Sequence, residues 1–109
     1  MIDSNLIEEI LRQYQKHGWN LRRVLLLPET RENLGDSTDS LFGETVPEKA
    51  DFDGLWFSRP SPGNREAWEL RHLSETPFAL FEAFAYDADE DFRSKKLSEM
   101  ETRLKNRTS

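Results

Sequence analysis

The segment GLWFSRPSPGNREAWELRHL, residues 54–73, decides how this chain folds. Its two arms, 54–59 and 65–73, are rich in the aromatic and aliphatic residues that favour strands. Between them stands Pro-Ser-Pro-Gly-Asn, a run with strong turn chemistry. The segment therefore predicts a β-hairpin. If the hairpin folds symmetrically about Pro62, Trp56 lies opposite Trp68, and an aromatic cross-strand pair stabilises a sheet by about 0.2–1 kcal/mol.

Two more strands are predicted outside the hairpin. Residues 22–27 form a short aliphatic run that ends at Pro28, and both faces of this run are apolar, which is typical of a strand that is covered on both sides. Residues 78–86 form the last strand, after a turn at 74–77. Neighbouring strands with short connections favour antiparallel pairing.

A helix is predicted at each end of the chain. Asn5 and Glu8 have the spacing of a capping box, with Asp3 as a competing cap, and apolar residues follow at helical spacing up to the terminator Gly18. The closing helix spans residues 87–106, with acidic residues in its first turn and basic residues in its last, as the helix dipole favours. Its apolar stripe is thin, which indicates a surface helix or a helix that packs against a partner.

These elements predict an α+β fold: a four-stranded, mostly antiparallel sheet flanked by the N-terminal and C-terminal helices. Residues 29–53 are polar and contain Gly35, Gly43 and Pro47, so we expect a long loop after the first strand, with one helical turn near 38–42. The 109 residues suit a single domain, 1–109, with one core. Twelve aromatic residues (3 Trp, 2 Tyr, 7 Phe) supply most of that core.

Composition narrows the classes of function. Cysteine is absent, which excludes disulfides, thiolate metal sites and cysteine nucleophiles. The sequence shows no signal peptide and no apolar run long enough for a membrane span, so a cytoplasmic protein without membrane contact is expected. The net charge of -6 lowers the expectation of nucleic-acid binding, because a protein surface that binds nucleic acid normally carries positive charge. An acidic chain suits a basic protein partner better.

Strand alternation predicts one sheet face that mixes aromatic and charged side chains. We assign the face of Trp56, together with Ala79, Phe81, Ala83 and Ala85, to the core beneath the first helix. The opposite face then carries the candidate binding residues. These are Phe57, Arg59, Glu69, Arg71, Glu82, Phe84 and Tyr86.

Three interpretations of this mixed face stay open. The closing helix covers it, with the charges at the rim. Alternatively, a protein partner or a second copy of the chain covers it, because aromatic residues and arginine are enriched at interfaces. In the third interpretation the face is a small-molecule pocket or active site that uses Glu69, Glu82 and Arg71, with two carboxylates dividing acid and base roles and Arg binding an anion.

No other pattern carries chemistry. His17 and His72 lack the spacing of a metal site, the acidic run at 87–91 departs from the calcium-loop pattern, and no phosphate-binding glycine loop is present. We therefore expect no cofactor, no metal and no nucleic acid. The sequence favours a small non-enzymatic binding or adaptor protein that acts through its aromatic and charged sheet face, with a protein partner or as a homodimer. A small-molecule site at Glu69, Glu82 and Arg71 is the alternative.

Overall fold

The predicted hairpin forms and lies in the middle of the sheet. The structure is a computed structural model that describes residues 3–108. In it, β3 (Gly54–Ser61) pairs antiparallel with β4 (Arg65–His72). In the turn between them Gly63 and Asn64 have φ values of 80° and 57°. Glycine and asparagine adopt this left-handed region most readily, so the sequence of the turn explains where the hairpin reverses.

The predicted pairing of the two tryptophans is wrong by two residues. The hairpin is centred on Gly63 rather than Pro62, so Trp56 lies opposite Leu70. Trp68 lies diagonally across from Trp56, with the ring centroids 6.0 Å apart in an edge-to-face arrangement. Both rings therefore share one face of the sheet, because a shift of two residues keeps every side chain on its face.

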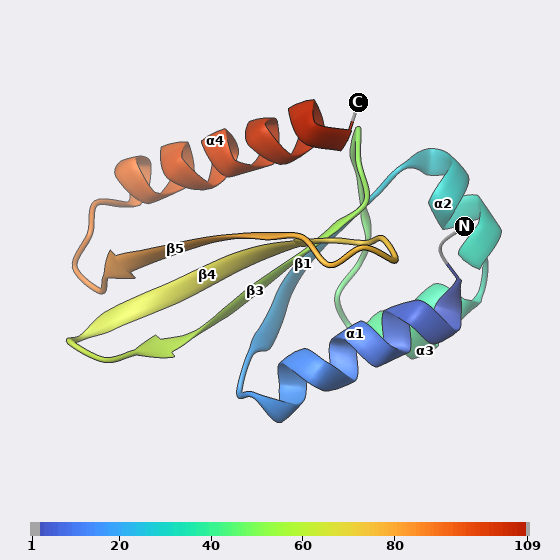
Figure 1. The fold of residues 1–109 in the computed structure, drawn as a ribbon, viewed down its shortest axis with the longest axis horizontal. Coiled ribbons are helices and arrows are strands. Elements are labelled where there is room, and N and C mark those ends of the chain that lie inside the picture. Colours follow the sequence, from blue (N-terminus) through green and yellow to red (C-terminus); the bar gives the residue numbers. More distant parts are fainter. Residues whose placement is uncertain (1–2, 109) are drawn as a thin grey trace.

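The sheet has five strands rather than four, in the order β2-β1-β3-β4-β5 (Figure 1). The three strands outside the hairpin are β1 (Asn20–Leu26), β2 (Glu48–Lys49) and β5 (Ala79–Ala85). β1 pairs antiparallel with β3, and β5 with β4, whereas β2 is parallel to β1. The fold is thus α+β with a mixed sheet, and the strand that the sequence did not predict has only two residues.

The expectation of a long loop over 29–53 is wrong. The segment contains α2 (Pro28–Leu34) and α3 (Ser37–Phe42) in addition to β2. Each of these helices has a single buried residue, Leu34 or Phe42, and therefore no repeating apolar stripe that a sequence pattern could reveal. The turn expected near 38–42 is α3.

The two terminal helices are α1 (Ser4–Lys16) and α4 (Glu90–Thr108). A carboxylate oxygen of Asp3 accepts a hydrogen bond from the backbone N–H of Leu6 (2.8 Å), so Asp3 caps α1 in place of the expected Asn5. α4 begins three residues later than expected. None of the helices within residues 3–108 is long and apolar enough to cross a membrane.

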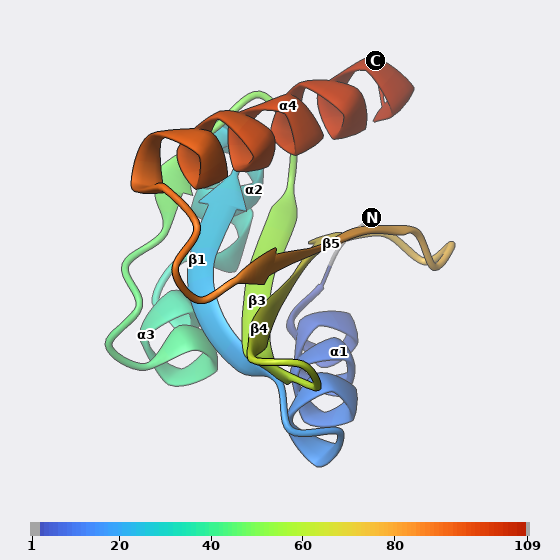
Figure 2. The same cartoon turned by 90° about the vertical axis from the view of Figure 1, so that its left-hand side faces the viewer.

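The two terminal helices cover opposite faces of the sheet (Figure 2). Leu55 and Phe57 pack beneath α1, whereas Trp56 and Trp68 pack beneath α4. We expected the reverse, with the Trp56 face under the first helix. Parity places residues on two faces but does not say which helix covers which face. The apolar stripe of α4 contributes the buried Met100 and Leu104 to the Trp56 side.

A β-bulge in β1 directs two consecutive arginines to the α4 side. Leu21 lies opposite Phe57 and Arg23 opposite Trp56, so Arg22 is an extra residue in the strand. The extra residue switches the parity of β1 beyond it, so Val24 packs on the α1 side and Leu25 on the α4 side.

Arg23 and Glu101 join α4 to three strands. One carboxylate oxygen of Glu101 accepts hydrogen bonds from the indole N–H of Trp56 (2.9 Å) and from Arg23 (3.1 Å). Arg23 also binds Glu48 of β2 through two nitrogens, at 2.9 and 2.8 Å. This hydrogen bonding lowers the pKa of the Glu48 carboxyl. The group holds the closing helix in register on the sheet.

Candidate functional site

The α1 side of the sheet is only partly covered. α1 packs over β1 and β3, and the outward side chains of β4 and β5 continue beyond it. The pairing register places these side chains on one surface, which we call the open face. Its residues are Arg65, Glu69, Arg71, Ala79, Phe81, Ala83 and Ala85.

Phe81 is the main feature of the open face. It lies opposite Glu69, and 57% of its surface is exposed, more than for most large apolar side chains of the molecule. Its neighbours on the same side of β5 are alanines, of which Ala79 and Ala85 are also exposed. Large apolar side chains that stay in water next to other apolar residues mark interaction sites more often than scattered ones do.

Tyr14 forms the border between the covered and the open part of this side. Its ring stacks on Phe57 with centroids 4.0 Å apart and planes 8° from parallel. Its hydroxyl donates a hydrogen bond to Glu69. Burial raises the pKa of Tyr14, and the hydrogen bond to Glu69 raises it further. Glu69 is therefore already engaged by a neutral phenol, which makes it a structural acceptor and a poor general base.

Arg59 closes the same border at its other end. Its guanidinium lies over the ring of Trp19, 4.5 Å from the centroid, and donates to the carbonyl oxygen of His17 (2.5 Å). A hollow of about 280 Å³ lies between α1 and the sheet here. It is lined by Gln13, Tyr14, His17, Trp19, Arg59 and Glu69.

The structure keeps four of the seven predicted site residues on one side. Phe57, Arg59, Glu69 and Arg71 all face the α1 side of the sheet. Phe57 is fully buried under Tyr14, so it supports the surface without being part of it. The other three contribute polar groups at the border or on the open face.

The prediction that Glu82, Phe84 and Tyr86 share this face is wrong. Glu82 lies opposite Trp68, and Phe84 is buried on the α4 side against the ring of Phe92. Tyr86 follows in the same parity and is 46% exposed. We expected a turn of four or six residues before the last strand.

A turn of odd length explains this error. The N–H of His72 donates to the carbonyl oxygen of Phe78 (2.9 Å), which leaves the five residues 73–77 in the turn. An odd change in turn length moves every side chain of the following strand to the other face. Phe81 was missed for the same reason, because it was assigned to the core. No signal in 78–86 could have corrected this, since both parities of that strand are apolar.

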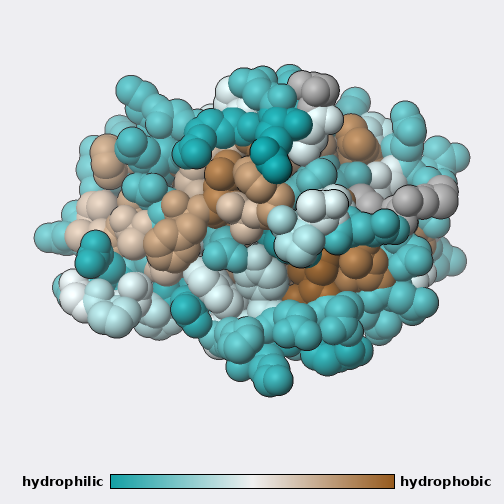
Figure 3. Space-filling model, in the orientation of Figure 1, coloured by the Kyte–Doolittle hydropathy of each residue, from teal (hydrophilic) through white to brown (hydrophobic). Residues whose placement is uncertain are grey.

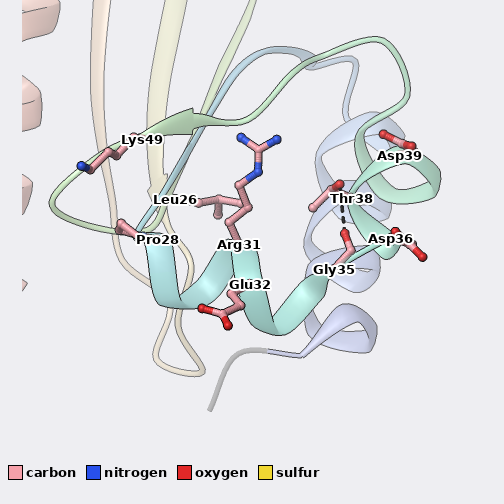
Figure 4. Close-up of a pocket in the computed structure, with 9 residues that line it drawn as sticks. All are labelled: Leu26, Pro28, Arg31, Glu32, Gly35, Asp36, Thr38, Asp39 and Lys49. Carbon is pink, nitrogen blue, oxygen red and sulfur yellow. Dashed lines mark hydrogen bonds between the residues drawn. The ribbon is translucent and has the colours of Figure 1, made fainter.

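One cavity, lined by residues of α2 and α3, holds no convergent set of polar groups. It has a volume of about 670 Å³ and lies where α2 and α3 meet the edge of the sheet. Arg31 lines it and donates to the carbonyl oxygen of Pro47 (3.2 Å). Figure 4 shows Lys49 directed away on one side, and Asp36 and Asp39 away on the other. Binding sites for small molecules place their polar groups toward one point, and this cavity does not.

A second hollow, of about 640 Å³, lies beside His72 and Arg107. Asp53 on its wall is buried and accepts hydrogen bonds from the N–H of Leu27 and the hydroxyl of Thr30, both at 2.8 Å. Burial lowers the pKa of His72, with Arg71 and Arg107 adding to the effect and Asp53 opposing it. The hydrogen bonds of Asp53 link the start of α2 to the sheet, so Asp53 has a structural role here.

Metal chemistry and known relatives give no further guide. Within residues 3–108, no three His, Cys, Asp or Glu side chains come together as a metal-binding group. Comparison with protein families, with curated proteins and with solved structures found no match to this chain.

Proposed function

We propose that this protein is a non-enzymatic binding or adaptor module, and that its open face binds a protein partner. The observation that supports the proposal is the 57% exposure of Phe81 on a strand whose other residues on that side are alanines. Small alanines let another protein surface approach the sheet closely. Phe81 supplies the buried aromatic contact that dominates the energetics of many interfaces.

The charges around Phe81 indicate the chemistry of the partner. Arg65 and Arg71 occupy the two ends of the β4 side of the open face, and Glu69 between them is bound by Tyr14. Guanidinium groups pair bidentately with carboxylates. The partner surface that fits best is therefore aliphatic in its centre, above Phe81, and carries carboxylates at its ends, although the net charge of the whole chain is -6.

The alternative small-molecule or enzymatic site receives less support. It requires Glu69, Glu82 and Arg71 on one face, and the pairing of Glu82 with Trp68 separates that carboxylate from the other two. An acid–base pair needs both carboxylates within reach of one substrate. We therefore do not extend the proposal to catalysis.

Photo-crosslinking tests the proposal in cells that naturally produce the chain. A benzophenone amino acid replaces Phe81 in one variant and Phe92 in a control variant. Phe92 is a matched position because it is an exposed aromatic residue (51%) on α4, outside the open face. We expect a discrete adduct with another protein from position 81 that position 92 does not give. Excess wild-type chain should suppress this adduct, and excess Phe81→Asp chain should not.

Two results would overturn the proposed function. Equal labelling from both positions would mean that the open face has no preferred partner. An adduct at position 81 that contains only a second copy of this chain would limit the surface to self-association. Either result is read from the mass of the adduct and from the peptides that it contains.

A further inference from the structure

The β5 strand is an unprotected edge of the sheet. β5 pairs with β4 only, so one side of its backbone has no partner strand among the described residues. Phe78 accepts a backbone hydrogen bond from His72, and the N–H of Tyr86 donates to Asn64 across the same pair of strands. Even-numbered residues of β5 thus point their N–H and C=O groups toward β4, because the pattern alternates along a strand. The groups of the odd-numbered residues point outward.

The opposite edge of the sheet shows how an edge is usually protected. β2 is two residues long, and both of its residues, Glu48 and Lys49, are charged. Short, charged edge strands discourage pairing with other chains. β5 has seven residues, AlaLeuPheGluAlaPheAla, without lysine or proline. β5 is therefore neither short nor interrupted by proline, and Glu82 is its one charged residue.

We propose that a second copy of this chain pairs antiparallel with β5, so that a twofold axis joins two five-stranded sheets into one. A register centred on Phe81 places this residue opposite Phe81 of the second copy and places Ala79 opposite Ala83. All three are outward-pointing residues, so each forms a hydrogen-bonded pair. This register also keeps the two Glu82 side chains from facing each other, and like charges directly opposite destabilise a sheet.

The charges at the two ends of β5 favour a second copy as the occupant. Residues 87–91, after the strand, contain Asp87, Asp89, Glu90 and Asp91 and no base. At the other end, Arg107 lies over the ring of Phe78, 3.9 Å from its centroid. Lys105 in the same turn of α4 is paired with Asp51 (3.0 Å) and does not add to this basic end. Antiparallel pairing about a twofold axis brings the acidic end of each copy beside the basic end of the other. The charge of Glu75, in the turn before β5, reduces this attraction in part.

The surface of the molecule agrees with this arrangement. Figure 3 looks onto the edge where Figure 1 draws β5, and apolar atoms form a strip there beneath the hydrophilic outer surface of α4. Pairing along the strip would remove it from water and give its unpaired backbone groups partners, two favourable contributions of different kinds. It would also place two open faces side by side on the same side of the joined sheet.

The solution mass of the purified chain, measured by light scattering over a wide concentration range, tests this inference. We expect a concentration-dependent rise from 12.8 kDa to twice that mass. Raising the salt concentration should weaken the dimer, because the end charges are exposed and screened. A mass that stays at 12.8 kDa at the highest concentration would overturn the inference.

Two variants locate the interface. Ala83→Pro removes an outward N–H without affecting the pairing of β5 with β4, and Ala83→Lys adds a charge at the same place if the proline variant fails to fold. Both should remain monomeric at concentrations where the wild type is dimeric. Val46→Asp is the control and should dimerise like the wild type, because Val46 is 71% exposed and lies just before β2, at the opposite edge of the sheet. If a folded Ala83 variant still forms a dimer, the interface of that dimer lies elsewhere, which contradicts the proposal.

The inference and the proposed function can fail separately. The mass measurement uses only the pure chain, whereas the crosslinking experiment detects other proteins. A monomer that gives a hetero-adduct from position 81 keeps the proposed function and rejects β5 pairing. A dimer without such an adduct supports β5 pairing and rejects the proposed function.

Discussion

Tyr14 connects the first helix to the border of the open face through one hydroxyl. Replacing it with phenylalanine keeps the ring that stacks on Phe57 and removes the donor to Glu69. We expect Tyr14→Phe to lower the free energy of unfolding by about 1.5–3 kcal/mol, as for other hydrogen bonds to charged groups. Urea denaturation followed by tryptophan fluorescence measures this. A Tyr14→Phe variant as stable as the wild type, beside a clearly destabilised Tyr14→Ala variant, would show that the ring, and not the hydroxyl, is what matters.

The same hydroxyl predicts how stability depends on alkaline pH. The pKa of Tyr14 is raised, mainly by burial, so above pH 10 the folded chain holds a proton that the unfolded chain releases. Stability must then fall as pH rises above about 10. The Tyr14→Phe variant should lose less stability than the wild type between pH 9 and 11, as denaturation curves at each pH would show. Parallel curves for the two proteins would contradict the assignment.

His72 predicts a pH dependence at the other end of the range. Its pKa is lowered in the folded state, mainly by burial, so the unfolded chain binds a proton more readily. The stability associated with neutral His72 is present above pH of about 6.5 and decreases as pH falls through that value. Between pH 7.5 and 5.5 the wild type should lose stability more steeply than His72→Gln. His17→Gln, at the exposed end of α1, is the control for removing a histidine.

At the scale of elements, the attachment of α4 depends on Glu101. This carboxylate is the acceptor for the indole N–H of the fully buried Trp56, and it also binds Arg23. Glu101→Ala leaves a buried donor without a partner, which costs about 1–3 kcal/mol. We expect that loss in urea denaturation, whereas Glu101→Gln should retain most of the stability because its amide oxygen still accepts.

Glu99→Ala is the matched control for this prediction. Glu99 lies on the exposed side of the same helix and pairs with Lys96 at 3.9 Å, with both side chains about half exposed. Exposed pairs of this kind contribute about 0–1 kcal/mol. If Glu99→Ala and Glu101→Ala destabilise the protein equally, the effect comes from helix composition and not from the contact with Trp56.

The sequence predicted those elements whose signals are local. The turn chemistry of 60–64 located the hairpin, and the apolar stripe of the first helix located α1. The short helices α2 and α3 were not predicted because each buries only one side chain. The candidate site was only half predictable, since Arg59, Glu69 and Arg71 follow from the parity of one hairpin. Placing Phe81 and Glu82 depended on whether the turn at 73–77 has an odd number of residues, and pairing between strands decides that.

At the scale of the whole molecule, the proposed dimer predicts a pattern of amide hydrogen exchange along β5. In the monomer the even-numbered amides of β5 are bonded to β4 and should exchange slowly, whereas those of Ala79, Phe81 and Ala83 point outward and should exchange fast. Dimerisation gives the outward amides partners, because each belongs to a hydrogen-bonded pair across the twofold axis. NMR exchange rates at a low and a high protein concentration would reveal this change.

A contact between the two copies tests the register itself. With pairing centred on Phe81, Leu80 lies opposite Glu82 of the second copy in a pair without hydrogen bonds, where the two Hα protons come close. A register centred on Glu82 would instead place the two Glu82 side chains face to face. An NOE between the Hα protons of Leu80 and Glu82 of different copies, measured on a mixture of labelled and unlabelled chain, therefore supports the proposed register. Its absence in a dimer with slowed outward amides supports the other one, and no slowing in a dimer would place the interface on the helices.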